Sequence, residues 1–176
     1  MASKMRMYYV DCGGLQAVHK SGFVHGDFHP GNILFINHLN RGHTTLVYQG
    51  GLTKMCRMMK FMVWFHNPYI APEVLHGKPY TQAADIYSFG MILYEIITEK
   101  KPFIEHDHEA KEFFKEYSAL DNTGLIFDIA KGIRPKIGTL TPKCISEIIQ
   151  QCRDEDSEKR PQVAEFIPKL KRFIFT

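Results

Sequence analysis

The stretch from residue 85 to residue 98 constrains the fold more than any other part of the sequence. At helical spacing its apolar side chains face almost every direction, whereas a helix on a protein surface keeps one polar face. Glu95 interrupts the richest apolar run, so the segment is too broken to span a bilayer. The sequence therefore predicts a central helix covered by the other elements of a mainly α domain. Its apolar residues are Ile86, Tyr87, Phe89, Met91, Ile92, Leu93, Tyr94, Ile96 and Ile97.

Shorter patterns predict the elements around this helix. Apolar residues recur at three- and four-residue steps before Gly22, which predicts a helix that ends there. Two β-like runs with a polar turn between them predict a short hairpin. Thr141 and Pro142 are typical of a helix cap and a first helical residue. The predicted elements are helix 5–19, strands 33–36 and 44–47, a loop with a short exposed helix over 99–124, a helix after Pro142 and a last helix over 162–173.

The composition indicates one globular domain in a reducing compartment. The 176 residues are enough for a single core, and 44% of them are hydrophobic. A formal net charge of +3 gives no reason to expect nucleic acid or an anionic membrane as a partner. The four cysteines form no C-x-x-C pair, and the N-terminus lacks a basic start followed by a long apolar core. We therefore expect a cytoplasmic protein with no nucleic-acid partner and no membrane partner.

Residues 25–32 read HGDFHPGN, and this octapeptide carries the strongest chemical signal. Asp27 is followed five positions later by Asn32, which is the spacing of a phosphotransferase catalytic loop. In such a loop the carboxylate orients the attacking hydroxyl, and the amide oxygen holds a magnesium ion that also contacts the nucleotide phosphates. The octapeptide is also similar to that of small-molecule kinases of the aminoglycoside-phosphotransferase type, so it does not decide the class by itself.

Three later motifs favour one class. They are the Ala-Pro-Glu triplet at 71–73, the D-x-x-S-x-G pattern at 85–90 and the Arg-Pro pair at 160–161. In this order and at these separations the chain resembles the eukaryotic protein kinases, in particular the Ser/Thr and tyrosine-kinase-like group. The resemblance runs from about Lys4 to about Phe173. It implies the mainly α C-terminal lobe of a kinase, with a short β-hairpin near the catalytic loop.

The resemblance also implies roles for individual residues. Asp27 takes the catalytic position, Asn32 takes the place of a metal ligand, and His25 packs beneath the loop. Glu73 and Arg160 match a long-range buried ion pair. The D-x-x-S-x-G aspartate, Asp85, matches an acid that braces the loop backbone. The implied cofactors are ATP and Mg²⁺, and the implied partner is a protein substrate or another protein.

Several departures from the family pattern weaken the expected chemistry. Where the family has Asp-Phe-Gly, this chain has Gln49 followed by two glycines, and a neutral amide binds magnesium less well than a carboxylate does. His29 replaces a lysine, and Gly26 replaces an arginine found in many kinases. No glycine-rich loop or strand lysine precedes the first helix, so no cofactor-binding motif is intact. We expect residues 1–176 to be a partial kinase domain without its N-terminal lobe, with little or no activity and weak ATP binding.

Two other functions remain open at this point. A pseudokinase-type interaction module would bind a protein through the groove around Tyr80 to Phe103 and through the apolar segment 55–66. A small-molecule phosphotransferase is favoured only by the octapeptide and is opposed by the three later motifs. The sequence does not distinguish Ser/Thr acceptors from Tyr acceptors.

Overall fold

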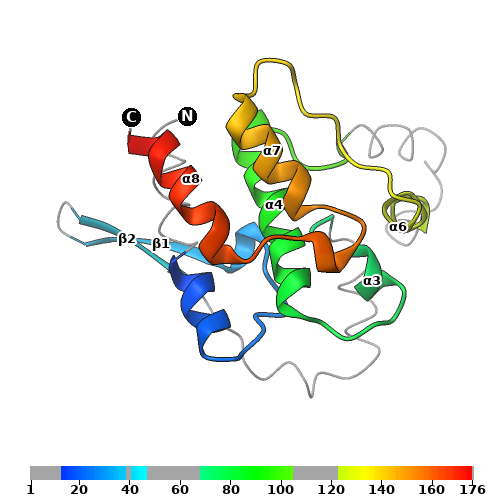
Figure 1. The fold of residues 1–176 in the computed structure, drawn as a ribbon, viewed down its shortest axis with the longest axis horizontal. Helices are drawn as coiled ribbons and strands as arrows, with labels where there is room; N and C mark the ends of the chain where they lie inside the picture. The colour runs from blue at the N-terminus through cyan, green and yellow to red at the C-terminus, as the bar shows by residue number, and fades with distance from the viewer. Residues whose placement is uncertain (1–12, 39–40, 47–67, 105–122, 176) are drawn as a thin grey trace, which may run out of the picture.

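The computed structural model describes residues 13–38, 41–46, 68–104 and 123–175, which form a mainly helical domain (Figure 1). A helix over residues 13–20 comes first. The elements that follow are η1 (Pro30–Asn32), β1 (Ile33–His38), β2 (Arg41–Leu46), α3 (Pro72–Leu75), α4 (Gln82–Thr98), α6 (Thr123–Ala130), α7 (Lys143–Cys152), η3 (Ser157–Lys159) and α8 (Val163–Phe175).

Helix α4 is the central buried helix that the sequence predicts. Thr81 caps its N-terminus, because its hydroxyl oxygen accepts a hydrogen bond from the Ala84 amide at 3.3 Å. Twelve of its seventeen residues are buried, including polar Asp85 and Ser88. In Figure 1 this helix runs through the middle of the molecule, with α7 alongside it. The prediction of a helix covered on all sides is confirmed.

Helices α7 and α8 supply much of that cover. Phe89 of α4 stacks on Phe166 of α8, with ring centroids 4.8 Å apart. Gly90 allows α4 and α7 to approach closely, since a Cβ at this position would lie 2.7 Å from the Cβ of Cys152. The core of the domain therefore lies along α4, where contacts this close leave no room for an added methyl group.

We expect Gly90→Ala to lower the free energy of unfolding by about 1 to 3 kcal/mol, the range for overpacking a core. Alanine favours a helix more than glycine does, but the clash with the Cys152 Cβ exceeds that gain because neither backbone can move freely. Chemical denaturation measures the effect. The matched control is Gly138→Ala, because a Cβ there meets nothing within 4 Å. Equal stability of the two variants would contradict this account of the contact.

The helix over residues 13–20 ends as the sequence predicts. Gly22 has a φ of +77°, and its amide donates to the His19 carbonyl at 3.0 Å. The Phe23 amide donates to the Val18 carbonyl at 3.1 Å, which completes a Schellman motif and turns the chain into the loop over 25–32. The first part of the predicted helix, residues 5–12, lies outside the described residues.

The two strands pair antiparallel directly after that loop, with Ile33 opposite Leu46 and His38 opposite Arg41. They extend two or three residues further into the connection than the sequence indicates, because the polar residues of the predicted turn continue the ladder. In Figure 1 the hairpin projects away from the helices. Residue 47, the last of the predicted second strand, lies outside the described residues.

The sequence analysis places the start of one helix wrongly and misses another helix. Helix α7 begins at Lys143, with Pro142 and not Thr141 at its N-cap, and no side chain caps it. Helix α6 was not predicted at all, although Gly132, with a φ of +83°, ends it in the same way that Gly22 ends the first helix. Most of the predicted loop over 99–124 lies outside the described residues.

Within the described residues, we find no helix with the length and apolarity needed to cross a membrane.

Candidate functional site

Asp85 holds the backbone of the loop over 25–32 in place. Its carboxylate accepts hydrogen bonds from the amides of His25 at 2.7 Å and Gly26 at 2.9 Å. The same carboxylate lies 2.9 Å from Nε2 of His19, at the end of the first helix. Asp85 is only 1% exposed, so these contacts replace its lost hydration. One buried carboxylate at the start of α4 therefore fixes both the first helix and the loop, and the predicted bracing role is confirmed.

We expect Asp85→Asn to destabilise the protein by about 1 to 3 kcal/mol, the cost of leaving a buried donor without a partner. The amide keeps the volume of the carboxyl group but turns an N–H group toward the backbone amides of His25 and Gly26. Hydrogen exchange of these two amides should accelerate more than exchange in α7 or α8. Asp156→Asn is the control, because this exposed side chain accepts a surface amide hydrogen bond that asparagine can also accept, and its ion pair with Lys159 lies at the surface. Unchanged exchange at both loop amides would rule out the bracing role.

His25 and Gly26 have structural positions in the loop. His25 is 5% exposed, and its ring packs against the Phe28 ring in a T-shaped arrangement with the centroids 5.3 Å apart. Its Nδ1 also lies 3.4 Å from the Asp27 amide, which can donate to it. Gly26 has a φ of +74°, a backbone conformation that glycine adopts without strain. The prediction that His25 packs beneath the loop is confirmed.

Asp27 and Asn32 lie in direct contact. Nδ2 of Asn32 donates to the Asp27 carbonyl at 2.8 Å and to Asp27 Oδ2 at 2.9 Å. Asn32 is buried at the end of η1, whereas the Asp27 side chain is about a quarter exposed. The structure therefore brings together the two residues that the sequence singles out, in an orientation set by two hydrogen bonds.

The surroundings favour an ionised Asp27. The neighbouring His29 lowers the pKa of Asp27 most, burial opposes this effect, and Asn32 and His25 lower the pKa further. Burial and the negative charges of Asp27 and Asp85 raise the pKa of Tyr80 above its ordinary value. At neutral pH the site therefore combines a carboxylate with a neutral phenol. Sequence analysis did not identify Tyr80 as a neighbour of Asp27.

The described residues do not complete a magnesium site. With Nδ2 of Asn32 bonded to Asp27, only its Oδ1 is suited to bind a cation, and a hard dication prefers several oxygen ligands with at least one carboxylate. Within the described residues, no group of three or more His, Cys, Asp or Glu side chains is placed to hold a metal ion. Gln49 lies outside the described residues. The donor set seen here does not fit a tightly held Mg²⁺.

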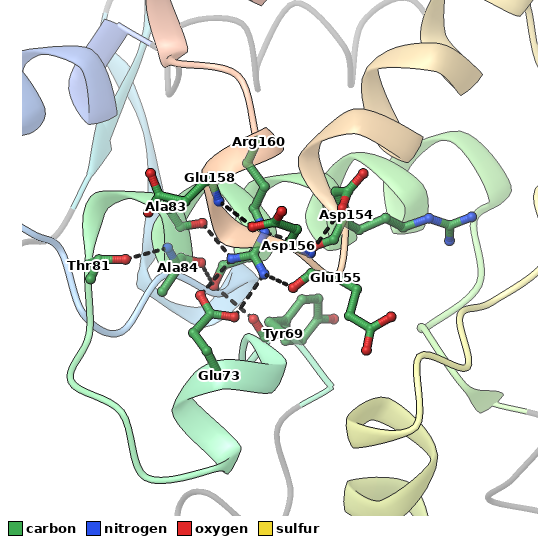
Figure 2. Close-up of polar contacts among 12 residues, drawn as sticks. Tyr69, Glu73, Thr81, Ala83, Ala84, Asp154, Glu155, Asp156, Glu158 and Arg160 are labelled. Atoms are coloured by element: carbon green, nitrogen blue, oxygen red, sulfur yellow. Dashed lines mark hydrogen bonds and ion pairs between the residues drawn. The ribbon is translucent and has the colours of Figure 1, made fainter.

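Arg160 and Glu73 form the predicted ion pair away from the loop. Figure 2 shows the guanidinium group reaching toward the Glu73 carboxylate, with distances of 2.6 Å for Nη1–Oε1 and 2.8 Å for Nη2–Oε2. Arg160 also donates to the carbonyls of Ala83 at 3.0 Å and Asp154 at 2.9 Å. The Arg160 side chain is fully buried and that of Glu73 is 10% exposed. The prediction of a buried pair is confirmed.

Polar contacts also join the segment before Glu73 to α4. The Ser88 hydroxyl donates to the Tyr69 carbonyl at 2.8 Å, and the Tyr69 hydroxyl donates to the Glu95 carboxylate. The segment that enters α3 is therefore fixed to the central helix from one side and to Arg160 from the other.

Comparisons with known proteins agree with the family that the sequence motifs resemble. The family model described as protein kinase domain matches residues 3–169. The chain is 30% identical to the dual specificity protein kinase shkA of Dictyostelium discoideum, over 99% of this chain and 32% of that protein. It is 31% identical to the protein kinase and PP2C-like domain-containing protein of Arabidopsis thaliana, over 84% of this chain and 25% of that protein. It is 27% identical to the serine/threonine-protein kinase STY46 of Arabidopsis thaliana, over 90% of this chain and 25% of that protein. The chain spans 32% or less of the length of these curated relatives.

Proposed function

Because this chain belongs to the protein kinase family, we propose that it carries the catalytic loop of an ATP-dependent phosphotransferase acting on protein hydroxyls. In this proposal residues 1–176 correspond to the C-terminal lobe of the kinase domain. Asp27 is the catalytic residue, which accepts a hydrogen bond from the incoming hydroxyl and directs it toward the transferred phosphate. We expect transfer by this chain to stay at background, because the metal-binding part of the machinery is incomplete.

The observation that carries the proposal is the double hydrogen bond from Asn32 to Asp27. The bond to Oδ2 fixes the carboxylate before any substrate arrives, the bond to the carbonyl fixes the Asp27 backbone, and Asp85 holds the two preceding residues. Positioning of this kind lowers the entropy cost of bringing a hydroxyl to a phosphate. The low pKa of Asp27 keeps the group able to accept a hydrogen bond at neutral pH.

The metal site is the incomplete part of the catalytic machinery. ATP and Mg²⁺ are the cofactors that kinases of this family use, and bound Mg²⁺ would neutralise the charge that develops on the phosphates. Asn32 is the metal ligand we assign on this chain, through Oδ1. The sequence places the amide of Gln49 where the family has its metal-binding carboxylate. We therefore propose weak binding of magnesium and nucleotide by this chain.

An interaction module is the alternative function. Its two predicted surfaces gain no support from the described residues: Phe103 is 6% exposed and belongs to the core, and segment 55–66 lies outside the described residues. A function as a small-molecule phosphotransferase gains no support either, because the Glu73–Arg160 pair and the family match both favour protein kinases.

A thermal-shift titration tests the metal assignment. We expect ATP and Mg²⁺ together to leave the Tm of the parent chain unchanged and to raise that of Gln49→Asp by at least about 2 °C. Adding Asn32→Ala to Gln49→Asp should abolish the rise, because the second ligand is then lost. Gln162→Asp, at an exposed glutamine, is the control for the added charge. A rise in the parent chain, or one that survives Asn32→Ala, would contradict the assignment.

A further inference from the structure

In the sequence analysis, His29 is only a residue that replaces a lysine of the family. In the structure, its side chain lies beside Asp27. Its Nε2 is 3.6 Å from Oδ1 of Asp27, and both side chains are partly exposed, at 29% and 24%. The distance is too long for a hydrogen bond and short enough for a direct electrostatic contact. Oδ1 is the carboxylate oxygen that Asn32 does not bind. The two oxygens of Asp27 therefore face two different neighbours, Asn32 on one side and His29 on the other.

A backbone hydrogen bond fixes the orientation of the His29 ring. The Gly31 amide donates to Nδ1 of His29 at 3.1 Å, so this nitrogen must be the unprotonated one in the neutral ring. The ring proton is then on Nε2, the atom that faces Asp27. The loop itself thus selects the tautomer that presents an N–H group to the carboxylate.

Gly31 also supplies the space for the ring. A Cβ at residue 31 would lie 2.9 Å from Cε1 and 3.1 Å from Nδ1 of His29. Any larger residue at this position would push the imidazole out of its place. Gly31 therefore has two functions in the loop. Its amide donates a hydrogen bond to the His29 ring, and its lack of a side chain leaves space for that ring.

We propose that His29 is a positioning residue that, together with Asn32, brackets the carboxylate of Asp27 and sets its orientation. This role deepens the proposed function and rests on it, because Asp27 is the group that would receive the substrate hydroxyl. The other groups near Asp27 are His25 beneath the loop, Tyr80 and, behind the backbone, Asp85. His29 is also the largest single cause of the lowered pKa of Asp27, in agreement with this contact.

The first test reads the tautomer directly by NMR. In the full chain labelled with ¹⁵N-histidine, at a pH where imidazoles are neutral, His29 should show a fixed Nε2–H tautomer. His29→Ala assigns its signals among the nine histidines. Gly31→Ala should convert the signal to an average of both tautomers, and Gly138→Ala, where a Cβ has open space, should leave it unchanged. An averaged tautomer in the parent chain would overturn the proposal.

The second test measures whether the ring positions Asp27. Exchange of the Asn32 side-chain amide hydrogens should be about twofold to fivefold faster in His29→Ala, the range expected for losing one weak, partly exposed electrostatic contact. His29→Gln should restore slow exchange, since its amide can also present an N–H group. Equal exchange in the parent chain and His29→Ala would refute the positioning role. Neither test uses nucleotide, so their outcome is separate from the magnesium titration that tests the proposed function.

Discussion

Arg160→Leu is expected to lower the free energy of unfolding by about 3 to 5 kcal/mol, the cost of breaking a buried ion pair. The substitution leaves the Glu73 carboxylate in a site that is only 10% exposed, without the guanidinium group that neutralises it. It also removes the donor that satisfies the Ala83 and Asp154 carbonyls. The Arg160 guanidinium further stacks over the Tyr87 ring, 5.2 Å from its centre, and leucine cannot replace that contact.

Urea denaturation of the parent chain and the variant measures this loss. Lys159→Leu is the matched control: this neighbouring cation is exposed and pairs with Asp156 only at the surface, at 3.6 Å. Such pairs contribute at most about 1 kcal/mol. A midpoint of unfolding that Arg160→Leu leaves unchanged would show that the pair does not connect α3 to the C-terminal helices in solution.

The parts of the fold that the sequence predicts well are those with strong periodicity or a distinctive motif. Helix α4 is apolar on all sides, and Glu73, Asp85 and Arg160 stand in motifs whose partners the family resemblance supplies. Helix α6 was missed because the charged residues before it dominate the stretch 99–124, although Gly132 gives a usable stop signal.

The candidate site is predictable in its residues and not in its geometry. Asp27 and Asn32 are found from their spacing within the octapeptide over 25–32, and the family resemblance implies their roles. The contacts of Asp85 with His19 and the loop join residues 59 to 66 positions apart, and no local pattern specifies which atoms meet. The contact of His29 with Asp27 depends on the missing side chain of Gly31, a residue to which the sequence analysis assigns no role.

Phosphoryl transfer by the 176-residue chain is expected to remain at background. The reaction depends on positioning and on neutralising the phosphate charges. The loop retains the positioning carboxylate, but Gln49 supplies no charge to hold a magnesium ion, and His29 stands where the family has a lysine. Losing one preorganised electrostatic group costs roughly 10²- to 10³-fold in rate, so the two losses together outweigh what Asp27 retains.

The measurement that tests this account most directly is the transfer of labelled phosphate from ATP, with Mg²⁺, to a general protein substrate. The parent chain and Asp27→Asn are compared at equal concentration, because the variant removes the carboxylate and keeps the volume of the side chain. We predict the same background transfer for both proteins. Transfer by the parent chain that Asp27→Asn abolishes would contradict the account and show that the loop is catalytically competent despite Gln49.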